Sequence, residues 1–143
     1  MIKLALITGC GHTGTTLLAR MMGVHSMIYN PPYETNIFLA YNVLQWDDLL
    51  ELHFSKAKET KEECRILLEK TPRHIWHVDY INSVVPTAKV ILMTRNGRDV
   101  VASLYERTGD IDSAILRYKD DSYLTRNKKQ KPANQRVFLL LQS

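Results

Sequence analysis

The chain has 143 residues, a length typical of one domain with a sizeable core. Apolar residues make up 45% and charged residues 24%, as in ordinary globular proteins, and the net charge of +4 favours anionic ligands without indicating a nucleic-acid-binding arm. Two cysteines are too few for a disulfide or zinc framework, and no apolar run is long enough to span a membrane. Without a recognisable targeting peptide, we expect one cytoplasmic domain over residues 1–143, with no metal and no nucleic-acid partner.

Apolar periodicity, capping residues and turn residues divide the chain into strands and helices. In chain order they predict a strand over 2–8, a helix over 15–24, helices over 35–45 and 47–58, a strand over 65–68, a helix over 74–84, a strand over 89–94, helices over 97–107 and 110–124, a loop over 126–136 and a strand over 137–141. Thr35 is the expected N-cap of the second helix.

Strands that alternate with helices predict an α/β fold, with helices on both faces of a mostly parallel sheet and right-handed crossovers. Polar clusters follow three of the strands, at 9–16, 69–73 and 95–99. Because ligands of such sheets bind beyond the carboxyl ends of the strands, we expect the three clusters to converge at one edge.

A glycine-rich loop follows the first predicted strand. Gly9 and Gly14 have the spacing of a phosphate-binding loop, in which the backbone approaches an anion and the helix start offers free N–H groups. Triphosphatases carry a lysine after the second glycine, whereas this chain has Thr15 and Thr16, whose hydroxyls are further donors. The loop therefore predicts a phosphate site without the cation that ATP or GTP hydrolysis needs. The alternative is a tight turn with helix-capping threonines.

A second anion site is predicted where the strand over 89–94 ends. Arg95 follows this strand, and Ser103 lies eight residues further on, about two turns into the next predicted helix. An arginine fork and a serine hydroxyl can hold one phosphate between them. The alternative is that Arg95 pairs with a surface carboxylate and Ser103 only fills a helix face.

Together these motifs resemble the sulfotransferases that use 3′-phosphoadenosine 5′-phosphosulfate (PAPS). That family has a [Lys/Arg]-[Ser/Gly]-Gly-Thr-Thr loop after its first strand, to which residues 12–16 are similar, and an arginine with a serine eight residues later, as in the pair above. The stretch LEKTPRHI at 68–75 has the family's Lys-x-Pro element, and the Arg-Asn-Gly-Arg of 95–98 is typical of protein-tyrosine sulfotransferases and their bacterial relatives. The likeness covers about residues 3–125 and implies a three-layer fold of the P-loop type.

The resemblance implies PAPS as the sulfuryl donor, no metal, and an acceptor hydroxyl or amine on a small molecule, carbohydrate or peptide. The residues that it implies for cofactor binding are Gly11, His12, Thr13, Gly14, Thr15 and Thr16 for the 5′-phosphosulfate, and Arg95 and Ser103 for the 3′-phosphate.

The resemblance also implies three catalytic residues. His12 stands where the family has a permanent cation at the leaving phosphate, and a bound phosphate is expected to raise its pKa above the usual value of about 6.5. Lys70 is expected to stabilise the sulfuryl group and the bridging oxygen, the alternative being a surface lysine paired with Glu69. Glu34 is the expected base for the acceptor, the alternative being a carboxylate at a helix N-terminus.

Three further polar residues follow the strand over 65–68. Arg73 is a further candidate contact for phosphate or acceptor, and His74 and His77 are expected to be helix-face residues rather than metal ligands.

Family members usually continue beyond a strand such as 137–141, so we expect this domain to lack the usual C-terminal part. Two functions stay open: a PAPS-dependent sulfotransferase, and a non-catalytic protein that binds PAPS or 3′,5′-ADP (adenosine 3′,5′-bisphosphate). His12 and the short chain favour the second function, whereas Glu34 and Lys70 favour the first. A nucleotide kinase is a third alternative, against which Thr15 argues.

Overall fold

The structure is a computed structural model that describes residues 2–39, 46–129 and 138–140. Its elements alternate as the α/β pattern predicts. They are β1 (Lys3–Gly9), α1 (Thr15–Gly23), β2 (Ile28–Tyr29), α2 (Trp46–Thr60), β3 (Ile66–Lys70), the 3₁₀ helix η2 (Pro72–His77), α3 (Val78–Val84), β4 (Lys89–Thr94), α4 (Gly97–Thr108), α5 (Ile111–Lys129) and β5 (Phe138–Leu140).

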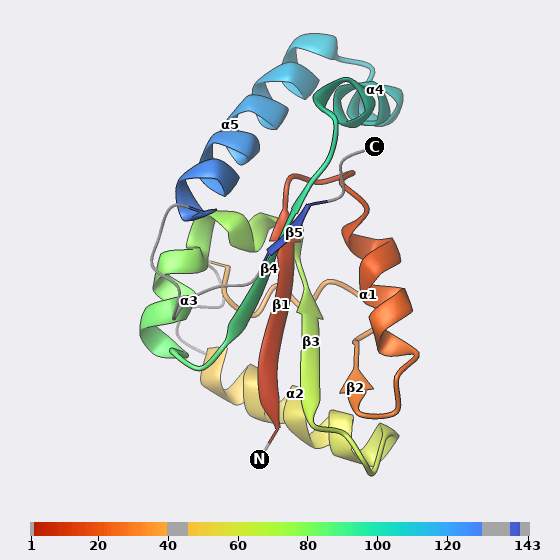
Figure 1. Cartoon of the computed structure of the whole chain (residues 1–143), viewed down its shortest axis with the longest axis vertical. Coiled ribbons are helices and arrows are strands. Elements are labelled where there is room, and N and C mark those ends of the chain that lie inside the picture. Colours follow the sequence, from red (N-terminus) through yellow and green to blue (C-terminus); the bar gives the residue numbers. More distant parts are fainter. Residues whose placement is uncertain (1, 40–45, 130–137, 141–143) are drawn as a thin grey trace.

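The sheet is parallel between all neighbouring strands and has the order β2–β3–β1–β4–β5. The central strand β1 pairs with β3 and β4, with Ile7 opposite both Lys70 and Ile91. Because these strands run the same way, the loops that follow them lie at one edge, below α4 and α5 in Figure 1. This arrangement confirms the predicted fold class.

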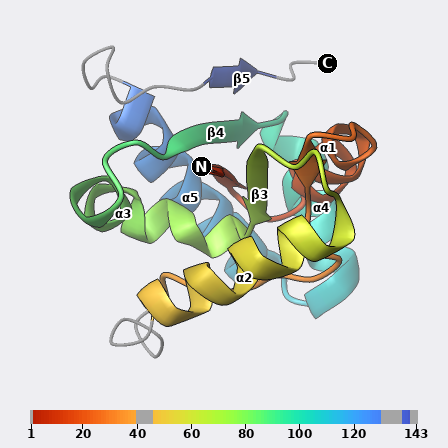
Figure 2. The same cartoon turned by 90° about the horizontal axis from the view of Figure 1, so that it is seen from below.

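Helices cover both faces of the sheet because the central strands β1 and β4 are apolar on both sides. Leu4 and Leu6 of β1 face a core formed with α2, η2 and α3, and Figure 2 shows α2 and α3 side by side on that face. The opposite face places Ile7 against Ala19 of α1. A strand buried on both faces is what the continuous apolar run of β1 predicts.

The helices α4 and α5 pack against each other beyond the carboxyl edge of the sheet. Their contact includes Val100, Leu104 and Ala114, and Cys10 of the loop after β1 lies in the same cluster. A Cβ atom on Gly97 would lie 2.6 Å from the Tyr118 ring, so only glycine permits this approach at the start of α4. The packing fixes α5 above the glycine-rich loop.

The predicted helix over 35–45 is wrong in the part that the structure describes. Residues 35–39 form irregular chain, a turn and a bend, and 40–45 lie outside the described residues. Thr35 does not cap a helix, because its hydroxyl donates to the Glu69 carboxylate, 34 positions away in the chain.

Three further differences concern element boundaries. β3 continues to Lys70, and the predicted helix over 74–84 begins earlier, as η2 with Pro72 near its start, before α3. α5 continues to Lys129, which contradicts the predicted loop over 126–136 as far as that residue; the remainder lies outside the described residues. The two-residue strand β2 gave no periodic signal.

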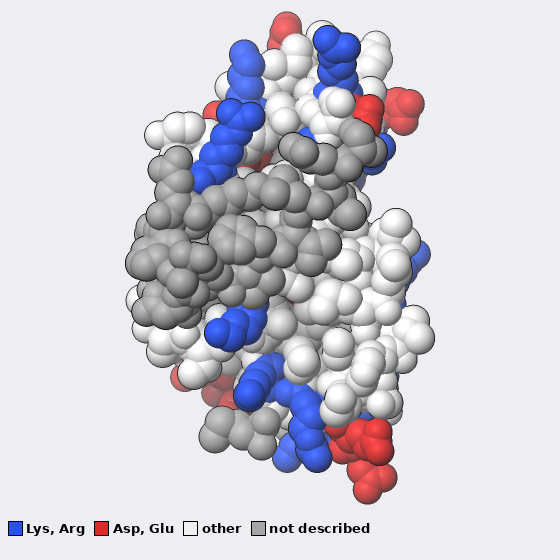
Figure 3. All heavy atoms as spheres, in the orientation of Figure 1, with Lys and Arg blue, Asp and Glu red and all other residues white. Residues whose placement is uncertain are grey.

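Figure 3 shows charged side chains of both signs on one face of the molecule. Lys and Arg occur at both ends of this face, with Asp and Glu at both ends as well. Every helix of the described residues is too short or too polar to cross a membrane.

Candidate functional site

The loop after β1 turns sharply through residues with positive φ. Gly9 has a φ of 141°, His12 of 66° and Gly14 of 91°. At Gly9 a Cβ atom would lie 2.4 Å from the Met93 carbonyl oxygen, so this strand end accepts no side chain. Gly14 is the N-cap of α1 and has no side chain to accept hydrogen bonds from the first helical N–H groups. The first backbone N–H groups of α1 are therefore free to donate hydrogen bonds to a bound anion.

His12 connects this loop to α4. Its Nδ1 atom lies 2.7 Å from the Ser103 hydroxyl, a contact across 91 positions of the chain. Burial and the positive charges of Arg107 and Arg117 lower the pKa of the imidazole below its ordinary value, which favours the neutral form of His12. The rise in this pKa expected from a bound phosphate stays a prediction.

A cavity of about 740 Å³ opens between the loop, the residue after β4, the end of α4, and α5. Its size suits a nucleotide-sized ligand. The lining residues are Gly11, His12, Gly14, Thr15, Thr16, Glu34, Asn36, Pro72, Arg73, Arg95, Arg107, Thr108 and Arg117. Four of these residues are arginines, and Glu34 is the one carboxylate among the described lining, so the cavity favours an anion of several charges.

Most of the predicted cofactor residues line this cavity, and two do not. The Thr13 side chain is buried, and its hydroxyl donates to the Cys10 carbonyl at 2.7 Å, which braces the loop. Ser103 reaches the site through its contact with His12. Arg95 is half-exposed and lies 3.4 Å from the Asp99 carboxylate, the surface pairing considered as its alternative. This partner screens Arg95 without removing it from the cavity lining.

Lys70 and Glu34 form an ion pair of 2.9 Å at the end of β3. The side chain of Lys70 is 12% exposed and that of Glu34 45% exposed. Glu34 lines the large cavity, whereas Lys70 lines a second cavity of about 580 Å³, and Thr16 belongs to both. The predicted base and second cation therefore lie together where two cavities adjoin.

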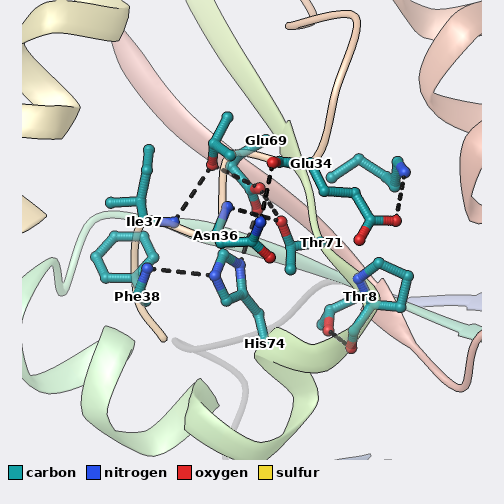
Figure 4. A network of polar contacts seen from close by, with 11 residues as sticks. Thr8, Glu34, Asn36, Ile37, Phe38, Glu69, Thr71 and His74 are labelled. Atoms are coloured by element: carbon teal, nitrogen blue, oxygen red, sulfur yellow. Dashed lines mark hydrogen bonds and ion pairs between the residues drawn. The ribbon is translucent and has the colours of Figure 1, made fainter. Parts of the chain in front are cut away.

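The alternative pairing of Lys70 with Glu69 is wrong. Glu69 is fully buried, and its carboxylate accepts hydrogen bonds from Thr35 at 2.8 Å and from Thr71 (Figure 4). Thr71 also accepts the Asn36 N–H at 3.3 Å. These contacts fasten the segment that carries Glu34 to the end of β3.

His74 completes the network from η2. Its Nε2 atom accepts the Phe38 N–H at 3.3 Å, so the ring proton lies on Nδ1, which donates to Glu69 at 2.8 Å. His74 lies in a helix, as expected, but its side chain is fully buried and belongs to this network. Burial opposes ionisation of Glu69, but His74, Thr71 and Thr35 together outweigh it and lower the pKa of the carboxyl below 4.5.

Sequence reasoning missed Arg107 and Arg117 as site residues. Arg107 follows Ser103 by four positions, so both lie on one face of α4, a signal that the sequence contained. Arg117 belongs to α5, whose packing over the loop has no local signature. Within the described residues, no three His, Cys, Asp or Glu side chains form a group that could hold a metal ion.

Comparison with known proteins identifies a family and a fold for the chain. Residues 39–129 match the model of the sulfotransferase family. No curated protein sequence gives a match. The sulfotransferase domain from the curacin biosynthetic pathway superposes with a TM-score of 0.67 at 14% identity, covering 98% of this chain and 67% of that one. A sulfotransferase from Alicyclobacillus acidocaldarius gives 0.63 at 17% identity, with coverages of 98% and 73%. Identities this low show a shared fold.

The buried carboxylate predicts that stability depends on pH. Glu69→Gln leaves one acceptor oxygen for three donors and should lower the free energy of unfolding at pH 7 by about 2–4 kcal/mol. Because the folded-state pKa is lowered, the stabilisation by Glu69 is complete above the ordinary pKa and is lost as pH falls through the lower folded value. The difference in unfolding free energy between Glu69→Gln and the unsubstituted chain, measured by urea unfolding, should therefore become smaller below about pH 4.

The control for this measurement is Glu59→Gln, which changes an exposed carboxylate on α2. It should leave the unfolding free energy within about 0.5 kcal/mol of the original. Equal stability of Glu69→Gln and the unsubstituted chain at pH 7 would show that the network does not stabilise the fold.

Proposed function

Because this chain belongs to the sulfotransferase family, we propose that it binds PAPS and transfers its sulfuryl group to a hydroxyl or amine acceptor. The observation that carries the proposal is the single cavity lined by both the glycine-rich loop and Arg95. A ligand with two separate phosphates suits such a cavity better than a linear triphosphate, whose outer phosphates would need the missing loop lysine.

We place the 5′-phosphosulfate at the N-terminus of α1, where backbone N–H groups and the hydroxyls of Thr15 and Thr16 act as donors. The 3′-phosphate lies with Arg95, Ser103 and Arg107. Arg107 and Ser103 share one face of α4, and Arg95 reaches the cavity from the end of β4. Charge-assisted hydrogen bonds from arginine then distinguish a bisphosphate from a monophosphate.

In the transfer step, Glu34 acts as a base and Lys70 stabilises negative charge. The acceptor oxygen or nitrogen forms a bond to sulfur while the bond from sulfur to the bridging oxygen breaks, which yields the sulfated acceptor and 3′,5′-ADP. Glu34 takes the acceptor proton, and Lys70 then faces the oxygen that receives the electron pair. Their 2.9 Å contact holds each near the junction of the two cavities before substrates bind.

The second cavity is the proposed entrance for the acceptor. It includes Lys70 and Thr16 together with the aromatic side chains Tyr29 and Tyr33. An acceptor with an apolar or aromatic body would pack against these rings, with its nucleophile directed toward Glu34.

The two-phosphate model makes a calorimetric prediction. The unsubstituted chain should bind 3′,5′-ADP about 10- to 100-fold more tightly than 5′-AMP, and Arg95→Ala should remove most of that difference. Arg98→Ala, an exposed arginine in the first turn of α4, is the matched control and should preserve the preference. Equal affinities for the two nucleotides would refute the model, and tight Mg²⁺-dependent binding of ATP would favour a kinase instead.

Turnover distinguishes an enzyme from a protein that only binds the nucleotide. With PAPS and a panel of acceptors, Glu34→Gln and Lys70→Ala should each slow transfer by about 100-fold or more, while 3′,5′-ADP binding changes by less than about threefold. Glu51→Gln, on the exposed side of α2, is the control. If Lys70→Ala weakens binding as much as transfer, Lys70 is a binding residue only. Tight binding of 3′,5′-ADP without turnover of any acceptor would support the non-catalytic alternative.

A further inference from the structure

Arg117 of α5 lies directly above the glycine-rich loop. Its Nη2 atom is 3.0 Å from the position that a Cβ atom on Gly11 would occupy. The residue lines the same cavity as His12 and Arg95, and its side chain is 40% exposed. A guanidinium at this position can reach both the loop and a ligand in the cavity.

The side chain is anchored on its own helix. Its Nε atom lies 3.8 Å from Asp121, whose carboxylate is 8% exposed and accepts the Trp76 indole N–H at 3.0 Å. This contact holds the stem of Arg117 through Nε and leaves the Nη groups directed toward Gly11. The loop beneath it contributes no opposing charge, because burial and Asp121 raise the pKa of the Cys10 thiol to about 12.

The loop itself has no permanent cation. Residues 9–16 include neither Lys nor Arg, and the lowered pKa of His12 favours its neutral form. Two other cations near the site have carboxylate partners, Lys70 with Glu34 and Arg95 with Asp99. Arg117 pairs with its carboxylate through Nε at 3.8 Å, as Arg95 does at 3.4 Å, and this geometry leaves the Nη donors of Arg117 beside Gly11 for a ligand. A phosphate at the start of α1 would therefore meet the Arg117 guanidinium.

We propose that Arg117 supplies from α5 the positive charge that the glycine-rich loop lacks, and that it binds the 5′-phosphate side of the nucleotide. The inference rests on the proposed function, since it assumes a nucleotide in this cavity. It assigns Arg117 to a different phosphate from Arg95 and Ser103. The two sets of residues should therefore respond differently to removal of the 3′-phosphate from the ligand.

The test compares 5′-AMP and 3′,5′-ADP by calorimetry at pH 7.5. Arg117→Ala should weaken both ligands by a similar factor of about 10 to 100, so that their affinity ratio is kept, whereas Arg95→Ala should act on 3′,5′-ADP alone. Arg126→Ala, an exposed arginine further along α5, is the control and should leave both affinities unchanged. A melting curve of each variant reports any loss of folded protein.

A compensating substitution separates charge from structure. His12→Lys puts an ammonium group into the loop, and in the Arg117→Ala background it should recover most of the lost affinity for 5′-AMP. A defect caused by the lost contact with Asp121 would not be repaired in this way. Failure of the double variant to recover binding, with both chains folded, would overturn the assignment.

The other possible results of the calorimetric test also bear on the role of Arg117. Unchanged affinities in Arg117→Ala would overturn the assignment and leave the proposed function intact. An effect on 3′,5′-ADP alone would move Arg117 to the 3′-phosphate and overturn it as well. If the unsubstituted chain binds neither nucleotide, the proposed function fails, and this inference fails with it.

Discussion

The site depends on the parallel pairing of β1 with both β3 and β4. This pairing ends three strands at one edge, so that the glycine-rich loop, the Lys70 region and Arg95 meet although they are far apart in the chain. The approach of Gly9 to the Met93 carbonyl marks how closely β1 and β4 lie at that edge. A side chain at this position would force the strands apart and displace the loop from Arg95.

The sheet edge has a buried negative charge and exposed positive charges. Below the surface, the Glu69 carboxylate is held by hydroxyls and an imidazole, and this buried network positions the segment that carries Glu34. At the surface, arginines from several elements converge on the cavity. The buried anion is fully hydrogen-bonded and serves the architecture, whereas the exposed cations keep donors for a ligand.

Features with a local pattern could be predicted from the sequence. The strand ends and the glycine-rich turn after β1 follow from glycine placement and apolar periodicity, and the structure places this loop and Arg95 around one cavity. The features that could not be predicted depend on contacts between residues far apart in the chain. Thr35 has every property of a helix cap, yet its hydroxyl serves Glu69, and no residue near Arg117 indicates that α5 will cross the loop. At these positions tertiary packing, rather than local helix propensity, determines the structure.

The central claim is that one cavity holds two phosphates at separate strand ends. A crystal structure of the chain with 3′,5′-ADP tests it most directly. The account predicts the 5′-phosphate within about 3 Å of the backbone N–H groups at the start of α1, and the 3′-phosphate in contact with Arg95 and Ser103. A nucleotide bound elsewhere, or one whose 3′-phosphate lies in solvent away from Arg95, would contradict it.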